Sequence, residues 1–80
     1  MNEQDALNLI KQALDKVDAG ISEKVSAKSN LVEDEILDSL DAMNFLFELN
    51  EVAGKDFPEI DDSYDDYRVS TLIEIIIKNA

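Results

Sequence analysis

Ser39 is the residue whose type and position most directly suggest chemistry, because it stands directly after Asp38 at the predicted start of an apolar helix. The first turn of a helix leaves backbone amides without intrahelical acceptors, and a serine there often caps them through its Oγ. On the local sequence alone, a cap is the simplest interpretation of Ser39. The same amides and the positive end of the helix dipole also favour an anion, so the hydroxyl is equally placed to carry an anionic group.

The chain cannot activate this hydroxyl by itself, because it contains no histidine and no cysteine. These absences remove the commonest general base, the commonest metal ligand, thiolate chemistry and disulfides. Gly20 and Gly54 are the only glycines and lie far apart, so a glycine-rich phosphate loop is excluded. Lys24 and Lys28 fall in a predicted surface loop without partners that would perturb their pKa. We therefore expect a protein that is not an enzyme and has no metal site of its own.

The composition describes one small acidic domain over residues 1–80. Nineteen acidic residues against seven basic ones give a formal charge of -12, which disfavours nucleic acids and anionic membrane surfaces and favours basic partner surfaces. The N-terminus lacks a signal-peptide pattern, and no stretch approaches the roughly 20 apolar residues of a membrane span. We expect a cytoplasmic monomer.

Apolar periodicity predicts two long helices in the first two thirds of the chain. The first covers residues 2 to about 18 and ends before Gly20, and its apolar positions recur every three or four residues: Leu7, Ile10, Leu14 and Val17. Residues 20–38 show no sustained period and predict a long loop, with room for a short helical turn. The second helix runs from residue 39 or 40 to 52 and stops at Gly54.

The last third of the chain predicts a short helix and a long one. The acidic residues 61–67 indicate one or two helical turns with Ile60, Tyr64 and Tyr67 facing inward. Thr71 followed by Glu74 is a capping-box pattern, which predicts a final helix from there to about residue 79. Alternating strand patterns are missing. The predicted fold is an all-α four-helix bundle, with three main helices, a short third helix and a long loop between the first two.

The order of these segments resembles the acyl carrier and peptidyl carrier family over nearly the whole chain. The family's motif, Asp-Ser-Leu at the start of the second helix, is matched by Asp38, Ser39 and Leu40. Further matching stretches are residues 30–34 of the loop, the apolar pattern of the second helix, residues 57–60 before the short third helix and residues 69–72 at the start of the last helix.

The resemblance implies that Ser39 carries a covalent 4'-phosphopantetheine arm. A phosphopantetheinyl transferase would attach it, using coenzyme A, and Asp38 would help to orient the transfer. An acyl-loading ligase and downstream synthase or transferase enzymes with basic docking surfaces would then be the partners. The resemblance assigns docking to six residues of the second helix: Leu40, Asp41, Met43, Phe47, Glu48 and Glu51. For the apolar ones, above all Met43, the alternative is a place in the core.

Some positions depart from carriers of fatty acid synthesis. Ile36 stands where those carriers usually have glycine, and Asn44 and Asn50 replace common acidic residues. This pattern is more similar to stand-alone carriers loaded by adenylating ligases and suggests a specialised pathway. Bulky Phe45 and the isoleucines of the last helix leave little room for a long acyl chain, so we expect a short or polar cargo, or one carried outside the bundle.

Two other classes of function remain as alternatives. A small acidic interaction module would use the apolar face of the second helix to bind a partner, with Ser39 only a cap. The acidic run from Asp61 to Asp66 could bind calcium, but a count for an EF-hand loop from Asp61 puts Asp66 where glycine is needed and Leu72 where glutamate is needed.

Overall fold

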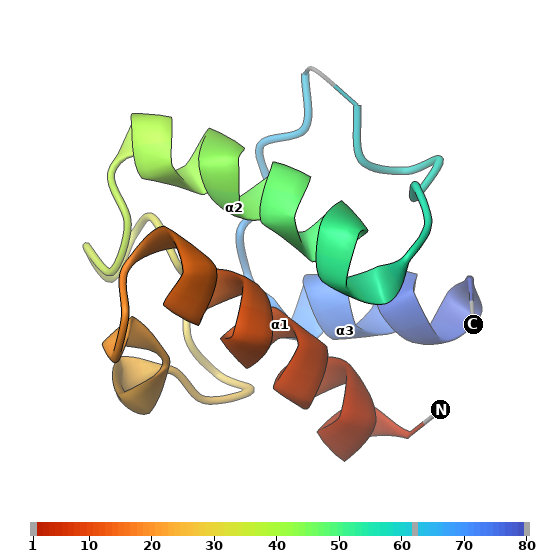
Figure 1. The fold of residues 1–80 in the computed structure, drawn as a ribbon, viewed down its shortest axis with the longest axis horizontal. Coiled ribbons are helices and arrows are strands. Elements are labelled where there is room, and N and C mark those ends of the chain that lie inside the picture. The colour runs from red at the N-terminus through yellow and green to blue at the C-terminus, as the bar shows by residue number, and fades with distance from the viewer. Residues whose placement is uncertain (1, 62, 80) are drawn as a thin grey trace.

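The computed structural model describes residues 2–61 and 63–79 and has three α-helices and one 3-10 helix, with no strand among the described residues. The elements are α1 (Glu3–Val17), η1 (Ile21–Lys24), α2 (Ser39–Ala53) and α3 (Val69–Lys78). α1 packs against both α2 and α3, with η1 close to its end (Figure 1). None of these helices has the length and apolar character needed to cross a membrane, as far as the described residues go.

The predicted bounds of α1 and α2 are confirmed to within one residue. The Asn2 side chain caps α1 by accepting a hydrogen bond from the amide of Asp5 at 2.8 Å. Gly54 ends α2 in the left-handed conformation (φ 71°), and its amide donates to the carbonyl of Asn50 at 3.0 Å. The long loop before α2 contains η1, so the predicted short helical turn is also confirmed.

The start of the last helix that the capping box predicts is wrong, whereas the start at residues 69–72 that the resemblance implies is confirmed. α3 begins at Val69, and Thr71 lies inside it, so the Thr71–Glu74 capping box does not form; Arg68 takes the N-cap position without a side-chain hydrogen bond. The backbone decides this start, because Val69 donates its amide to Ser29 at 2.9 Å. The residue just before the helix, Arg68, forms an isolated antiparallel β-bridge with Asn30.

The short third helix is also absent from the described residues between α2 and α3; Asp62 lies outside them. Aspartate side chains compete there with helical hydrogen bonds, as such residues do in turns. The Asp61 carboxylate accepts from the amide of Ser63 at 2.9 Å, and the Asp66 carboxylate accepts from the amide of Arg68 at 3.2 Å. The inward direction of Ile60, Tyr64 and Tyr67 is nevertheless confirmed, since all three are partly buried against the core.

The core takes apolar residues from all three α-helices and from both loops. Its largest fully buried side chain is Phe45 of α2. The loops contribute Val25, Leu31, Leu37 and Phe57, and the helices contribute Ala6, Ile10, Ala13, Leu14, Ala42, Phe45, Leu49, Val69, Leu72, Ile73, Ile75 and Ile76. The loops are therefore part of the packed structure and hold α2 at a defined place.

The ion pair between Asp66 and Arg68 makes one contact of this fold sensitive to acid. Two hydrogen bonds join the side chains, at 2.9 Å and 2.7 Å, and the bonding to Arg68 lowers the pKa of Asp66 to about 2. A carboxyl with a lowered pKa stabilises the folded state above its unfolded pKa, and this contribution disappears as the pH falls through the folded pKa. The pair should therefore lose its contribution at acid pH.

We expect Asp66→Asn to unfold at lower urea concentration than wild type above about pH 4. This difference should shrink as the pH falls towards the folded pKa of Asp66, about 2. Urea denaturation along a pH series measures it. Asp65→Asn is the control, because it removes a neighbouring charge and keeps the pair. A difference that is unchanged at the acid end of the series would contradict the assignment.

Candidate functional site

Asp38, rather than Ser39, is the N-cap of α2. Its backbone is extended, and its Oδ1 accepts a hydrogen bond from the amide of Asp41 at 2.7 Å. The simple interpretation of Ser39 as the cap is therefore wrong. Both residue types make good caps, and only the backbone geometry distinguishes the two positions.

Ser39 is the first residue of α2 and is exposed. Within the described residues its hydroxyl makes no hydrogen bond, and the amides of Ser39 and Leu40 have no acceptor. A group attached to the Oγ would therefore meet unpaired amides at the positive end of α2. The neighbouring carboxylates of Asp38 and Asp41 repel negative charge. An attached ester with one negative charge would therefore fit better than a group with two.

Replacement of the cap should weaken the fold at this end of α2. We expect Asp38→Ala to lower the free energy of unfolding by about 1 kcal/mol, because the amide of Asp41 then loses its acceptor. Urea denaturation measures the change, and Asp38→Asn, which keeps a capping oxygen, is the control. If Asp38→Ala and Asp38→Asn were equally stable, the cap would contribute nothing.

Three large apolar side chains of α2 face solvent. Leu40 is 68% exposed, Met43 is 65% exposed and Phe47 is 63% exposed. Phe45 and Leu49 of the same helix are fully buried, which settles the open question about Met43 in favour of the surface. We call Leu40, Met43 and Phe47 the apolar stripe. Exposed apolar side chains that lie together on one helix face are typical of an interaction surface.

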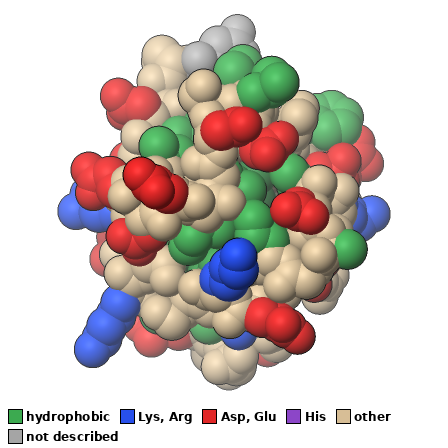
Figure 2. Space-filling model, turned by 90° about the vertical axis from the view of Figure 1, so that its left-hand side faces the viewer, with side chains coloured by type: hydrophobic (Ala, Val, Ile, Leu, Met, Phe, Trp, Pro, Cys, Tyr) green, Lys and Arg blue, Asp and Glu red, His purple; other side chains and the backbone are tan. Residues whose placement is uncertain are grey.

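Acidic side chains surround the apolar stripe. Glu51 is exposed on α2, and Asp41 and Glu48 are half-buried. On the face that carries the start of α2, acidic groups clearly outnumber basic ones, and apolar side chains lie between them (Figure 2). The predicted docking residues thus lie on one helix, with apolar and acidic groups interleaved.

A groove of about 230 Å³ borders the apolar stripe, between α2 and the segment before α3. Two polar atoms in its lining, Oδ1 of Asn50 and the hydroxyl of Tyr64, are buried and have no hydrogen-bond partner within the described residues. Burial raises the pKa of Tyr64 to about 12, so its hydroxyl keeps its proton and can donate. The complete lining is Met43, Leu46, Phe47, Asn50, Ile60, Asp61, Tyr64 and Tyr67.

The residue pattern predicts no functional role for Asn50 or Tyr64. Asn50 stands where carriers of fatty acid synthesis commonly have an acid, and Tyr64 is predicted only to face inward. The available signal was the position of Asn50, which follows Met43 and Phe47 along the same side of a helix with 3.6 residues per turn. A polar residue in this place extends the apolar stripe into a mixed surface.

Comparisons with protein-family models, with curated proteins and with solved structures find no match to this chain. The geometry of Ser39 and of the surface next to it is therefore the basis for a functional proposal.

Proposed function

We propose that this chain is a carrier protein, which holds an acyl, aminoacyl or related intermediate on a phosphopantetheine arm attached to Ser39. The observation that carries the proposal is the exposed hydroxyl of Ser39 at the first position of α2, which has no hydrogen-bond partner among the described residues while Asp38 performs the capping. A serine that is not needed as a cap and has no catalytic partner is suited to modification by another enzyme.

The chemistry of the attachment requires little from the chain itself. The Oγ of Ser39 would form an ester with the pantetheine-bearing phosphate of coenzyme A, and the bond between the two phosphates would break. Adenosine bisphosphate would leave, and the hydroxyl proton would pass to a base of the transferase. The arm supplies a terminal thiol for the thioester, which a chain without cysteine lacks.

The residues around Ser39 are compatible with such an arm. Ser39, Met43 and Asn50 lie on one side of α2, because their spacings are close to whole helical turns. The apolar stripe and the groove offer apolar surface, and Asn50 and Tyr64 offer an acceptor and a donor for amide groups. These are the residues that would hold the arm.

The resemblance to carriers also motivates a finer description of fold and pathway. A long loop between α1 and α2 ends at the Asp38, Ser39 and Leu40 motif, which supports a carrier-type arrangement although the described residues of the segment before α3 form no helix. Ile36, Asn44 and Asn50 support a specialised pathway rather than bulk fatty acid synthesis. The buried Phe45 supports a short or polar cargo.

The exposed apolar stripe and its acidic surroundings support docking on partner enzymes with basic surfaces. The same stripe is the specific observation in favour of the second candidate, an interaction module without a prosthetic group. The carrier protein and the interaction module differ only in whether Ser39 is modified.

Intact-mass measurement tests the proposal. After incubation with coenzyme A, magnesium and a broad-specificity phosphopantetheinyl transferase, the protein should gain the mass of one phosphopantetheine, and fragmentation should locate it on Ser39. An established carrier domain serves as the control for transferase activity. If that control is modified and this chain is not, the interaction module is the better description.

A further inference from the structure

The C-terminal end of α3 holds the segment that follows α2. The side-chain amide of Asn79 donates to both carboxylate oxygens of Glu59, at 3.0 Å and 3.2 Å, and to the carbonyl of Ile75, at 2.8 Å. The Nζ of Lys78 lies 3.5 Å from the same carboxylate. We call the contacts of Glu59 with Lys78 and Asn79 the clamp. Through the clamp, a residue of the segment is fastened to the last turn of α3.

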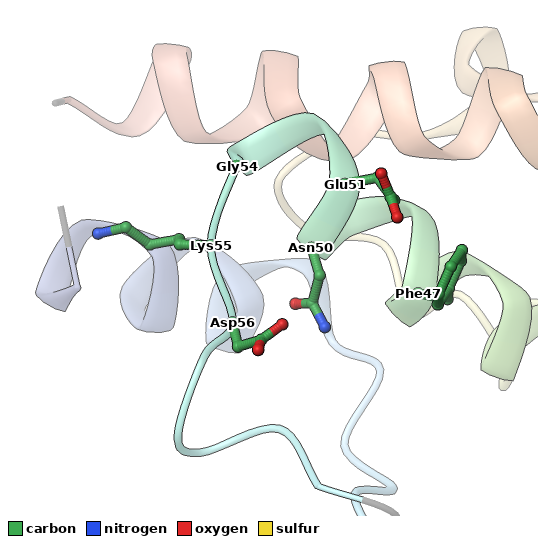
Figure 3. Close-up of a pocket in the computed structure, with 6 residues that line it drawn as sticks. All are labelled: Phe47, Asn50, Glu51, Gly54, Lys55 and Asp56. Carbon is green, nitrogen blue, oxygen red and sulfur yellow. The ribbon is translucent and has the colours of Figure 1, made fainter.

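Two further contacts hold the same segment in place. The Nζ of Lys55 donates to the backbone carbonyl of Asn79, and Figure 3 shows the Lys55 side chain extending towards α3. Phe57 lies between Lys55 and Glu59 in the sequence and is buried in the core. The segment therefore leaves α2 at Gly54 and is held by polar contacts with α3 on both sides of a buried phenylalanine.

The residues that follow the clamp form the wall of the groove that faces α2. We call them the outer wall: Ile60, Asp61, Tyr64 and Tyr67. The hydrogen bond from Leu31 fixes the far end of this wall at Tyr67. Within the described part of the chain, no hydrogen bond joins the outer wall to α2, and no Cα atom of α2 lies within 8 Å of a Cα atom of α3. The width of the groove therefore depends on apolar packing and on where the clamp holds the segment.

The two sides of the groove carry an unused acceptor and an unused donor. Oδ1 of Asn50 on α2 and the hydroxyl of Tyr64 in the outer wall are buried, and neither has a hydrogen-bond partner within residues 2–61 and 63–79. Figure 3 shows the Asn50 side chain directed from α2 towards the side on which Asp56 lies. A buried polar group without a partner destabilises a fold, and a hydrogen bond between these two groups would remove both costs. The groove is open in this structure although a narrower form would pair its polar atoms.

We propose that the groove has an open and a closed form and that the clamp keeps it open. Release of the clamp lets Tyr64 approach α2 and donate to Oδ1 of Asn50, and Ile60 moves with it and buries more apolar surface. The arm and the closed form compete for the same two polar atoms. Control of the arm by the clamp rests on the proposed function, in which the groove holds the arm, but the motion itself does not require modification of Ser39.

Tyrosine fluorescence tests the clamp, because the chain has no tryptophan and both of its tyrosines line the groove. Acrylamide quenching of their emission in the unmodified chain measures how open the groove is. Glu59→Ala and Asn79→Ala should each lower the quenching constant at least about 1.5-fold, because each releases the outer wall. The double variant should lower it no further, since both residues belong to one contact. Unchanged or stronger quenching in the single variants would overturn the proposal.

Matched variants separate the clamp from general effects on the surface. Asn8→Ala removes an exposed amide that accepts from Gln4 on α1, and Glu74→Ala removes an exposed carboxylate of α3 outside the clamp. Neither should change the quenching constant by more than about 1.2-fold. Asn50→Ala removes the acceptor of the closed form, and in that background Asn79→Ala should lower quenching less than it does in wild type. An equal effect in both backgrounds would contradict the closed form.

The outcomes also separate this inference from the carrier function. Circular dichroism should show unchanged helix content in the clamp variants, because Phe57 stays in the core. Lower quenching in the clamp variants of a chain that gains no phosphopantetheine would keep the clamp and reject the carrier function. A chain that gains the arm but whose quenching does not respond to the clamp variants would give the opposite result.

Discussion

Ser39→Ala should abolish the gain of one phosphopantetheine and leave the free energy of unfolding within about 0.5 kcal/mol of wild type. The first effect is complete, because alanine has no oxygen to form the ester. The second follows from the structure, in which the Asp38 carboxylate caps α2 and the Ser39 hydroxyl makes no hydrogen bond within the described residues. Intact mass and urea denaturation measure the two quantities on the same sample.

Ser70→Ala is the matched control, because Ser70 is an exposed serine in the first turn of α3. It should accept the arm as well as wild type does. A mass gain that persists in Ser39→Ala would contradict the assignment of Ser39. Loss of the gain together with a large loss of stability would instead show that Ser39 supports the fold.

Phe45→Ala should remove a large part of the stability of the domain. Phe45 is fully buried, and truncation of a buried phenylalanine costs about 3–5 kcal/mol through lost burial and the cavity that remains. A domain of 80 residues has on the order of 4–12 kcal/mol in total. We expect an early, broad urea transition and partial unfolding at elevated temperature, both measurable by circular dichroism.

Phe47→Ala is the comparison within the same helix. Phe47 is 63% exposed, so its truncation should change the free energy of unfolding by less than about 1 kcal/mol. Similar losses in the two variants would mean that the predicted inward and outward faces of α2 are misassigned.

Regular elements with clear apolar spacing could be predicted from the sequence. The bounds of α1 and α2 follow from apolar periodicity and from Gly54. The exposure of Met43 was undecided from the sequence, because two faces of α2 are apolar and only the packing against α1 selects between them.

The remaining features depend on contacts between distant residues or on backbone angles. The start of α3 coincides with the hydrogen bond from the amide of Val69 to the carbonyl of Ser29, a contact between distant residues that the Thr71–Glu74 pattern does not indicate. The choice of Asp38 over Ser39 as cap depends on one residue's backbone conformation. In the loop before them, Glu35 adopts the left-handed conformation (φ 59°). A glycine usually indicates such a turn, but neither Glu35 nor the next residue, Ile36, is a glycine.

The groove could not be predicted, because the described residues of the segment between α2 and α3 are irregular and reach the surface of α2 through contacts between residues distant in the sequence. Tyr64 and Asn50 come into the same lining only through that path. The acidic run at residues 61–67 predicts a short helix, but the carboxylates of Asp61 and Asp66 bind backbone amides two residues further on, which compete with helical hydrogen bonds.

The bridge between Asn30 and Arg68 has a consequence for the motion of Ser39. Leu31 donates its amide to Tyr67 at 3.0 Å and Val69 donates to Ser29 at 2.9 Å, so the loop leading to Ser39 is fastened to the start of α3. Amide hydrogen exchange at Leu31 and Val69 should therefore be slow and closely matched, since both protons become accessible in one opening event. The loop would then move together with the C-terminal helix, and under the proposed carrier function the reach of a carried group would come from the arm rather than from the loop.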